Sequence, residues 1–200
     1  MHASAQSVRL PQPRVTGSLS LEETLAARQS IRTFQADPLS LEQVSQLLWA
    51  AQGVTHDGRR RTAPSAGATY PLEVILTVRN VEGLKPGVYR YRPFDHALET
   101  IGALDVGRSL SRACLNQRFI ESAAVNVVLV ADYGRTVRRY GERGRRYVHM
   151  EAGHVGQNLY LQAEALGLGT VAVGAFEDDD VRRILGIRED VLYLFPVGRK

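Results

Sequence analysis

The stretch YVHMEAGHVGQNLYLQAEALGLGTVAVGAF, which runs from Tyr147 to Phe176, decides how the rest of the chain is organised. Its first twenty residues predict a helix with an apolar face. The residues that recur at helical spacing along this face are Val148, Ala152, Val155, Leu159, Ala163 and Leu166. A second apolar face contains Leu161 and Ala165, so we expect the helix to be covered on two sides.

Small residues in the same stretch indicate how the helix packs and where it ends. Ala152, Gly153 and Gly156 leave room for another backbone to pass close by, which favours a subunit interface. Gly167 predicts a left-handed stop to the helix. The run TVAVGAF, residues 170–176, then predicts a buried strand whose glycine exposes backbone amides to a ligand.

The composition is that of an ordinary globular protein, with 200 residues, 44% of them hydrophobic and 23% charged. We expect one domain over residues 18–200, preceded by a flexible arm over residues 1–17. The net charge is +4, and only Lys85 and Lys200 are lysines. Because arginine binds carboxylates and phosphates in a planar fork, an anionic small ligand suits this chain at least as well as nucleic acid.

The sequence also predicts where the protein works. No apolar run approaches eighteen residues, so we expect no membrane span, and the N-terminus lacks a charged-then-apolar signal pattern. Cys114 is the single cysteine, which excludes an internal disulfide and suits a reducing compartment. We therefore expect a cytoplasmic protein.

The other patterns predict several helices and few strands, an α+β fold. Two capping boxes start helices: Ser20 with Glu23 begins one that runs to about Arg28, and Ser40 with Gln43 begins one that Gly53 ends. Further expected elements are strands over residues 72–79, 87–93, 97–101, 123–132 and 191–198, a weak helix over 105–122, a helix over 179–185 capped by Asp178, and a long loop over 54–71.

Arg28, Ser30 and Arg32 form a candidate clamp for a phosphate or carboxylate, with a hydroxyl between two cationic forks. If the chain is extended here, all three project to one side; if it stays helical, the two arginines stack at i, i+4. The alternative is a solvated helix end with favourable charge. Arg199, after the last strand, is a further candidate for a phosphate.

Two other segments are candidates for contact with a ligand. The loop APSAGATYP places small residues and Ser65 between two prolines, so a planar ligand can approach its backbone, although an ordinary surface turn has the same composition. Val173, Gly174 and Ala175 follow the buried strand, and the glycine can turn its amide toward a ligand atom. The alternative there is a plain strand end.

The stretch from Arg135 to Arg146 holds six arginines, which could bind nucleic acid electrostatically. It lacks interleaved aromatic residues and any docking motif, so a solvated helix face or a gate over a ligand is favoured. The sequence offers no metal site either, because His149 and His154 are spaced poorly for one helix face. Neither a Walker loop nor a GxGxxG motif follows a strand.

Four blocks in order, across roughly residues 20–199, carry a family resemblance: RQSIRTF, RTAPSAGATYPLEV, EAGHVGQNLYLQAEALGLGTVAVGAF and LYLFPVGR. The chain resembles the nitroreductase family of flavin mononucleotide (FMN) enzymes. Its proline-serine-alanine-glycine loop and EAGH motif are most similar to the SagB-type branch, which includes azoline oxidases of peptide maturation. The resemblance implies a central mixed or antiparallel sheet flanked by helices, and an intertwined homodimer with two flavins at its interface.

By position, the resemblance assigns a flavin-binding role to fourteen residues. They are Arg28, Gln29, Ser30, Arg32, Pro64, Ser65, Ala66, Gly67, Asn116, Gln117, Val173, Gly174, Ala175 and Arg199. It implies that Arg28, Ser30 and Arg199 hold the phosphate, and that residues 64–67 come from the second subunit. Arg32 and one of the two amides at 116 and 117 would lie near the pyrimidine edge of the ring, and Gly174 near its N5.

The activity that the resemblance implies is ping-pong transfer of a hydride from NAD(P)H to a small flat acceptor, such as a nitroaromatic or a quinone. An alternative is a SagB-type azoline dehydrogenase. That branch has a lysine-tyrosine pair before the central helix, which corresponds to Arg139-Tyr140 here. Because arginine stays protonated, Tyr140 is the candidate catalytic residue. Two further classes are a flavin-binding module without turnover and a nucleic-acid binder that uses the arginine stretch.

Overall fold

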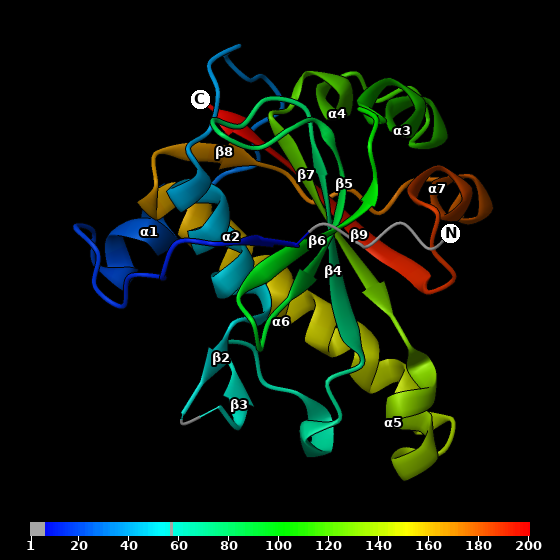
Figure 1. Ribbon diagram of the computed structural model, residues 1–200. Helices are drawn as coiled ribbons and strands as arrows, with labels where there is room; N and C mark the ends of the chain where they lie inside the picture. Colours follow the sequence, from blue (N-terminus) through cyan, green and yellow to red (C-terminus); the bar gives the residue numbers. More distant parts are fainter. Residues whose placement is uncertain (1–6, 57) are drawn as a thin grey trace.

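A seven-stranded antiparallel sheet forms the centre of the computed structural model, which describes residues 7–56 and 58–200 (Figure 1). Its strand order is β1-β6-β5-β4-β7-β9-β8, and β2 and β3 form a separate hairpin. The strands are β1 (Ser7–Arg9), β2 (Val54–Thr55), β3 (Arg60–Arg61), β4 (Leu72–Val78), β5 (Gly87–Arg92), β6 (Ala97–Gly102), β7 (Val125–Ala131), β8 (Leu168–Thr170) and β9 (Asp190–Arg199).

Helices cover both faces of this sheet. They are α1 (Leu21–Ala27), α2 (Leu41–Gln52), the 3-10 turn η1 (Ala66–Ala68), α3 (Gly107–Ala113), α4 (Phe119–Ser122), α5 (Tyr133–Tyr140), α6 (Arg143–Ala165) and α7 (Asp178–Leu185). The predicted α+β fold with a central antiparallel sheet flanked by helices is therefore confirmed. No helix in the described part of the chain is long and apolar enough to cross a bilayer.

Strand β7 shows how the sequence produces two cores. All seven of its residues are buried. Because successive side chains point to opposite faces, Val127 and Leu129 join the core under α2 and α6. Val128 and Val130 join the core under α3, α4 and α7. A strand with both faces covered reads as a continuous apolar run, which is why it was predictable.

The predicted apolar face of α6 is confirmed, because its members from Val148 to Ala163 are buried against the sheet. The helix begins at Arg143, earlier than the predicted Tyr147. Exposed arginines in its first turns are good helix formers, and Gly144 lets α6 pack against α5, since a Cβ there would lie 3.0 Å from the Thr136 backbone. At the other end Gly167, with φ of 70°, provides the predicted left-handed stop.

The second face of α6 is only partly covered. Met150 is 51% exposed, and a Cβ on Gly153 would meet nothing within 4 Å. The expectation for Gly156 is wrong: a Cβ there would lie 2.8 Å from the Phe195 ring, so this glycine seats a side chain of β9 and not another backbone.

Two predicted loops contain strands. Residues 1–6 of the arm expected over residues 1–17 lie outside the described part of the chain. The next residues, Ser7–Arg9, form β1, which pairs with β6 at the edge of the sheet. Further along, the Arg14 amide donates to the Gln46 side chain at 2.8 Å, so this segment is attached to α2. The loop expected over residues 54–71 contains the β2–β3 hairpin and η1.

Two other expectations are corrected. The strand predicted over residues 170–176 ends at Thr170, because the next amide available for pairing, that of Ala172, donates to the hydroxyl of Tyr160 at 2.8 Å. Asp178 is the first residue of α7 and not its cap. Glu177 takes the cap position, held outside the helix by its amide, which donates to the Ala113 carbonyl at 2.9 Å.

Candidate functional site

The segment after α1 leaves the helix and runs extended beside β8. The backbone turns at Arg28, Ser30 forms a parallel bridge with Thr170, and the Ile31 amide donates to the Thr170 carbonyl at 2.9 Å. Gly169 makes this approach possible, since a Cβ there would lie 2.6 Å from the Ile31 side chain. Of the two conformations considered for the candidate clamp, the structure has the extended one.

Tyr160 of α6 connects three parts of this region. Its ring lies under the Arg28 guanidinium, 5.2 Å from centroid to Cζ. Its hydroxyl is 2.9 Å from Ser30 Oγ and accepts the Ala172 amide at 2.8 Å. One aromatic side chain therefore positions Arg28, Ser30 and the start of the segment that contains Gly174.

Arg199 is attached to the same extended segment further along. Its Nε donates to the Pro38 carbonyl at 3.1 Å, and its own carbonyl accepts the Gln35 amide at 2.9 Å. Gln29 and Arg32 are exposed on this segment. We call Arg28, Ser30, Arg199 and Tyr160 the clamp; the first three supply two guanidinium groups and a hydroxyl, a donor set that suits a phosphate.

The segment predicted to face a ligand is held from behind. Val173 exchanges two backbone hydrogen bonds with Leu194, at 2.8 and 3.0 Å, while Gly174 and Ala175 are exposed. Gln117 Nε2 donates to the Ala175 carbonyl at 3.1 Å.

The two amide candidates are therefore separated. Gln117 lies at the segment that contains Gly174 and Ala175. Asn116, which is exposed and has φ of 62°, instead lines a cavity beside Arg108 and Arg118.

The small-residue loop, residues 64–67, is held by α5. Gly67 has φ of 59°, and its carbonyl accepts from Arg139 Nη1 at 3.0 Å. A Cβ on Gly67 would lie 2.6 Å from the Tyr140 hydroxyl. Ser65 Oγ accepts the Tyr70 amide at 2.9 Å, which closes the loop at its base. The candidate catalytic tyrosine thus lies directly against the predicted flavin loop.

Glu151 of α6 is a buried carboxyl beside this loop, and no role was predicted for it. It is 2% exposed, and its Oε1 has no hydrogen-bond partner among the described residues. Burial raises the pKa of Glu151 to about 7, against smaller lowering effects of Ser65, Gln52 and Arg61. The sequence does indicate that Glu151 is buried, because Val148 lies three residues before it and Val155 four residues after it on the apolar face of the helix.

The clamp and the small-residue loop lie toward opposite ends of α6. Tyr147 packs against Tyr140 with ring centroids 5.1 Å apart, and Tyr160 belongs to the clamp. These positions are about 20 Å apart along the helix axis. Figure 1 shows the same separation, with α1 near one end of α6 and α5 near the other. The structure brings Arg28, Ser30 and Tyr160 together, and it places residues 64–67 beside Tyr140, but it does not join the two groups.

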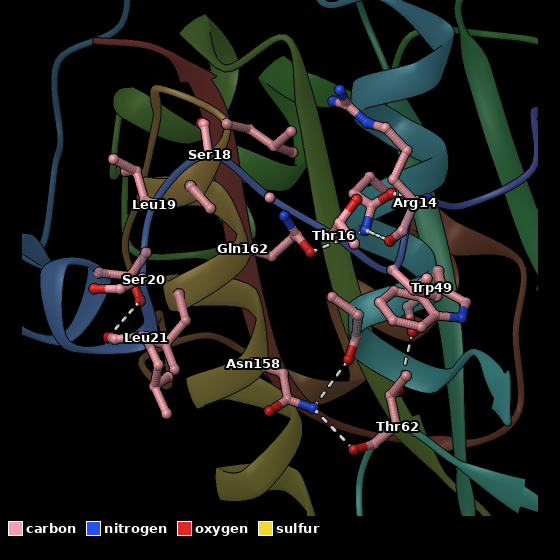
Figure 2. Close-up of a pocket in the computed structure, with 18 of the residues that line it drawn as sticks. Arg14, Thr16, Ser18, Leu19, Ser20, Leu21, Trp49, Thr62, Asn158 and Gln162 are labelled. Carbon is pink, nitrogen blue, oxygen red and sulfur yellow. Dashed lines mark hydrogen bonds between the residues drawn. The ribbon is translucent and has the colours of Figure 1, made fainter. Parts of the chain in front are cut away.

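A groove of about 690 Å³ lies along the second face of α6 (Figure 2). Leu161 and Ala165 of α6 line it, opposite Trp49 of α2 and the segment before α1. Its rim carries exposed apolar side chains: Val15 is 84% exposed, Leu19 42% and Leu21 59%. The second apolar face that the sequence predicted is therefore open to solvent here.

The nitroreductase family model matches residues 25–199, so the chain belongs to the nitroreductase family. It is an FMN-dependent oxidoreductase of the nitroreductase-like class. In the described part of the chain, no group of three His, Cys, Asp or Glu side chains is placed to hold a metal ion.

Individual relatives agree with this assignment. A protein of Methanocaldococcus jannaschii that carries the name nitroreductase (MJ1384) is 51% identical over 91% of this chain and 92% of its own length. The crystal structure of a nitroreductase-type protein from Ralstonia eutropha is 32% identical, with a TM-score of 0.84 over 96% of this chain and 89% of that one. The Microcin B17-processing protein McbC of Escherichia coli is 30% identical over 74% of this chain, which spans 57% of McbC.

Proposed function

We propose that this enzyme binds FMN between the clamp of one copy and the small-residue loop of a second copy, and passes a hydride from NAD(P)H to a small flat acceptor such as a nitroaromatic or a quinone. The observation that carries the proposal is the extended segment beside β8. It offers Arg28 and Ser30 from one short stretch, both supported by Tyr160.

The residues present fit this cofactor. A phosphate monoester is matched by the guanidinium groups of Arg28 and Arg199 and the Ser30 hydroxyl. Arg32 is exposed on the same segment, where its charge would favour negative charge on a bound ring. Gly174, also exposed, would donate its amide to that ring, and the ring supplies the capacity to accept and return a hydride.

A second copy of the chain accounts for two features that one copy leaves open. The clamp and the small-residue loop are too far apart along α6 to meet in one chain, and the groove on the second face of α6 is rimmed by exposed apolar residues. A homodimer that packs these surfaces together would bury the apolar rim and bring the loop of one protomer toward the clamp of the other.

We place the reaction in the cytoplasm, where a lone thiol stays reduced. Cys114 is fully buried, and burial raises the pKa of its thiol to about 12. The thiol therefore stays protonated, and it has no part as a nucleophile in the proposed reaction.

Stopped-flow spectroscopy of the FMN-loaded protein tests the proposal. NADH or NADPH should bleach the flavin absorption, and a quinone or nitroaromatic should restore it, with ping-pong kinetics in the steady state. Protein that takes up no FMN would overturn the cofactor assignment. Protein whose flavin responds to dithionite but to neither nicotinamide would instead support a flavin-binding module.

A second candidate is an azoline dehydrogenase of SagB type. It is supported by the position of Tyr140 against Gly67 and by the similarity to McbC. In that reaction a thiazoline or oxazoline peptide, in place of a nicotinamide, would be the hydride donor, and a separate acceptor would take the electrons. Bleaching by an azoline peptide, with neither nicotinamide effective, would decide for this candidate.

A further inference from the structure

A second cavity, of about 210 Å³, lies at the C-terminal end of α2. Its walls come from the β2–β3 hairpin, the start of β4, the end of β5 and the turn after it, and they include Gln52, Arg61, Tyr91 and Phe94. None of the residues assigned to the flavin lines it. At about 30 Å³ for each water molecule, the space holds about seven waters, or one small ring that carries a single substituent.

The floor of this cavity is a side-chain amide without a partner. Gln52 is 0% exposed, and neither its Nε2 nor its Oε1 makes a hydrogen bond within the described residues. Four buried side-chain atoms in the described chain lack a well-aligned partner; two belong to Gln52 and a third is Oε1 of Glu151, which lies beside the Gln52 amide. Because leaving a buried polar group unpaired is costly, such a concentration indicates that something polar occupies the space.

Arg61 brings a positive charge to the same wall. Its guanidinium lies between two aromatic rings, 5.2 Å from the Tyr70 centroid and 4.9 Å from that of Phe94, and it donates to the Gln52 carbonyl at 3.0 Å. No ion pair of Arg61 occurs within the described residues.

Glu151, behind Gln52, attracts Arg61 without forming an ion pair, and the carboxylates that line the cavity do not pair with Arg61 either. Glu73 is paired with both Arg90 and Arg135, and Arg92 is paired with Glu99. Asp95 is the other carboxylate at the wall. Three arginines against two carboxylates give the lining a positive balance, and Arg61 is hydrogen-bonded to the backbone of Gln52.

We propose that this cavity is a binding site for a small planar carboxylate, separate from the flavin. The carboxylate would accept from the Gln52 amide and the Arg61 guanidinium, and the flat body of the ligand would lie along the Tyr91 and Phe94 rings. A planar anion satisfies the buried donor and the unpaired cation together. A neutral amide could accept from both groups but would leave the charge of Arg61 without a counter-charge, and a cation would be repelled by it.

Isothermal titration calorimetry on the protein as purified tests this site, with benzoate, benzamide and benzamidinium as planar probes of similar shape and different charge. Benzoate should bind at least tenfold more tightly than benzamide, and benzamidinium should not bind. Equal binding of all three, or no binding of benzoate, would overturn the proposal and leave a water-filled cavity.

Variants locate the bound probe. Gln52→Leu and Arg61→Gln should each weaken benzoate binding at least tenfold, whereas Arg183→Gln, which removes an arginine paired with Asp180 on α7, should not. Unchanged binding in both cavity variants would place benzoate elsewhere, for example against the flavin, and would reject the site. The same experiment on flavin-free protein separates the two proposals, because this site predicts binding without FMN.

A reporter at the rim keeps the test independent of changes to the buried residues. Phe94 is 74% exposed, so Phe94→Trp should fold normally and place an indole beside the cavity. Its fluorescence should change with benzoate over the same concentration range as the calorimetric signal. A reporter that ignores benzoate while calorimetry detects binding would also reject the site.

Discussion

The clamp and the small-residue loop are built in opposite ways, although both are proposed to hold the same cofactor. The clamp consists of exposed or half-buried residues: Arg28 and Ser30 lie on an extended segment that β8 holds by backbone pairing, and Arg199 and Tyr160 come from β9 and α6. The loop ends in a left-handed residue, Gly67, two more left-handed residues, Ala68 and Tyr70, follow it, and a buried carboxyl lies beside it. The charged groups of the clamp thus lie where water can solvate them, whereas the strained backbone of the loop is held in place by the structure around it.

The largest expected effect concerns the buried carboxyl beside the loop. Because the pKa of Glu151 is about 7 in the folded protein and 4.5 ordinarily, the folded state binds more protons between these values. The contribution of Glu151 to the free energy of unfolding should therefore be most favourable below pH 4.5. It should fall by about 3 kcal/mol as the pH rises above 7. Urea unfolding of wild type and Glu151→Gln at pH 5 and pH 8 measures this.

The variant should lose that pH dependence and gain stability relative to wild type at pH 8. Glu142→Gln is the matched control, since Glu142 is exposed at the start of α6. If Glu151→Gln kept the slope of the wild type between pH 5 and pH 8, the carboxyl would not be the group that titrates.

The next effect is on the clamp. Arg28→Ala should weaken FMN binding by about 1.5–3 kcal/mol, or roughly 10- to 150-fold, because a charged hydrogen bond to phosphate is lost. Fluorescence titration with FMN measures it, with Arg183→Ala as the control of equal charge change. The stability of the apo protein should hardly respond, in contrast to the loop variant. An FMN affinity equal to that of the control would show that the clamp is misplaced.

A smaller effect is expected from the strain in the loop. Gly67→Ala should lower the free energy of unfolding by about 1–2 kcal/mol, because alanine is unfavourable at φ of 59° and its Cβ would approach the Tyr140 hydroxyl. Adding Tyr140→Phe should recover only the part due to that approach. Gly153→Ala is the control, and in an open helical position it should stabilise by up to about 1 kcal/mol. Equal effects of the two glycine changes would refute the strain.

The fold was predictable wherever burial follows a local period. The apolar face of α6 and the apolar run of β7 from Val127 to Ala131 are visible in the sequence because one or both sides of each element pack against a core. The capping boxes at Ser20 and Ser40 are equally local, and both are present. Such signals depend on residues a few positions apart.

The parts that were missed depend on residues distant in sequence. Tyr160 lies 130 positions from Ser30, the residue that its hydroxyl contacts. The same hydroxyl accepts a hydrogen bond from the Ala172 amide, so the strand predicted to reach Phe176 ends at Thr170. Gln52 ends a helix as an ordinary polar residue would, and its burial depends on elements distant in sequence that pack around it. A single sequence carries the candidate groups of the clamp but not the side chain that assembles them.

The smallest expected effect tests that assembling role. Tyr160→Phe keeps the ring under Arg28 but removes the hydroxyl shared by Ser30 and the Ala172 amide, so FMN binding should weaken about fivefold, or about 1 kcal/mol. Tyr147→Phe, at the loop end of the same helix, is the control. If the hydroxyl acts through Ser30, then Ser30→Ala combined with Tyr160→Phe should cost less than the sum of the two single changes. Strict additivity would mean that Tyr160 and Ser30 contribute independently, and that the clamp is two separate contacts on one segment.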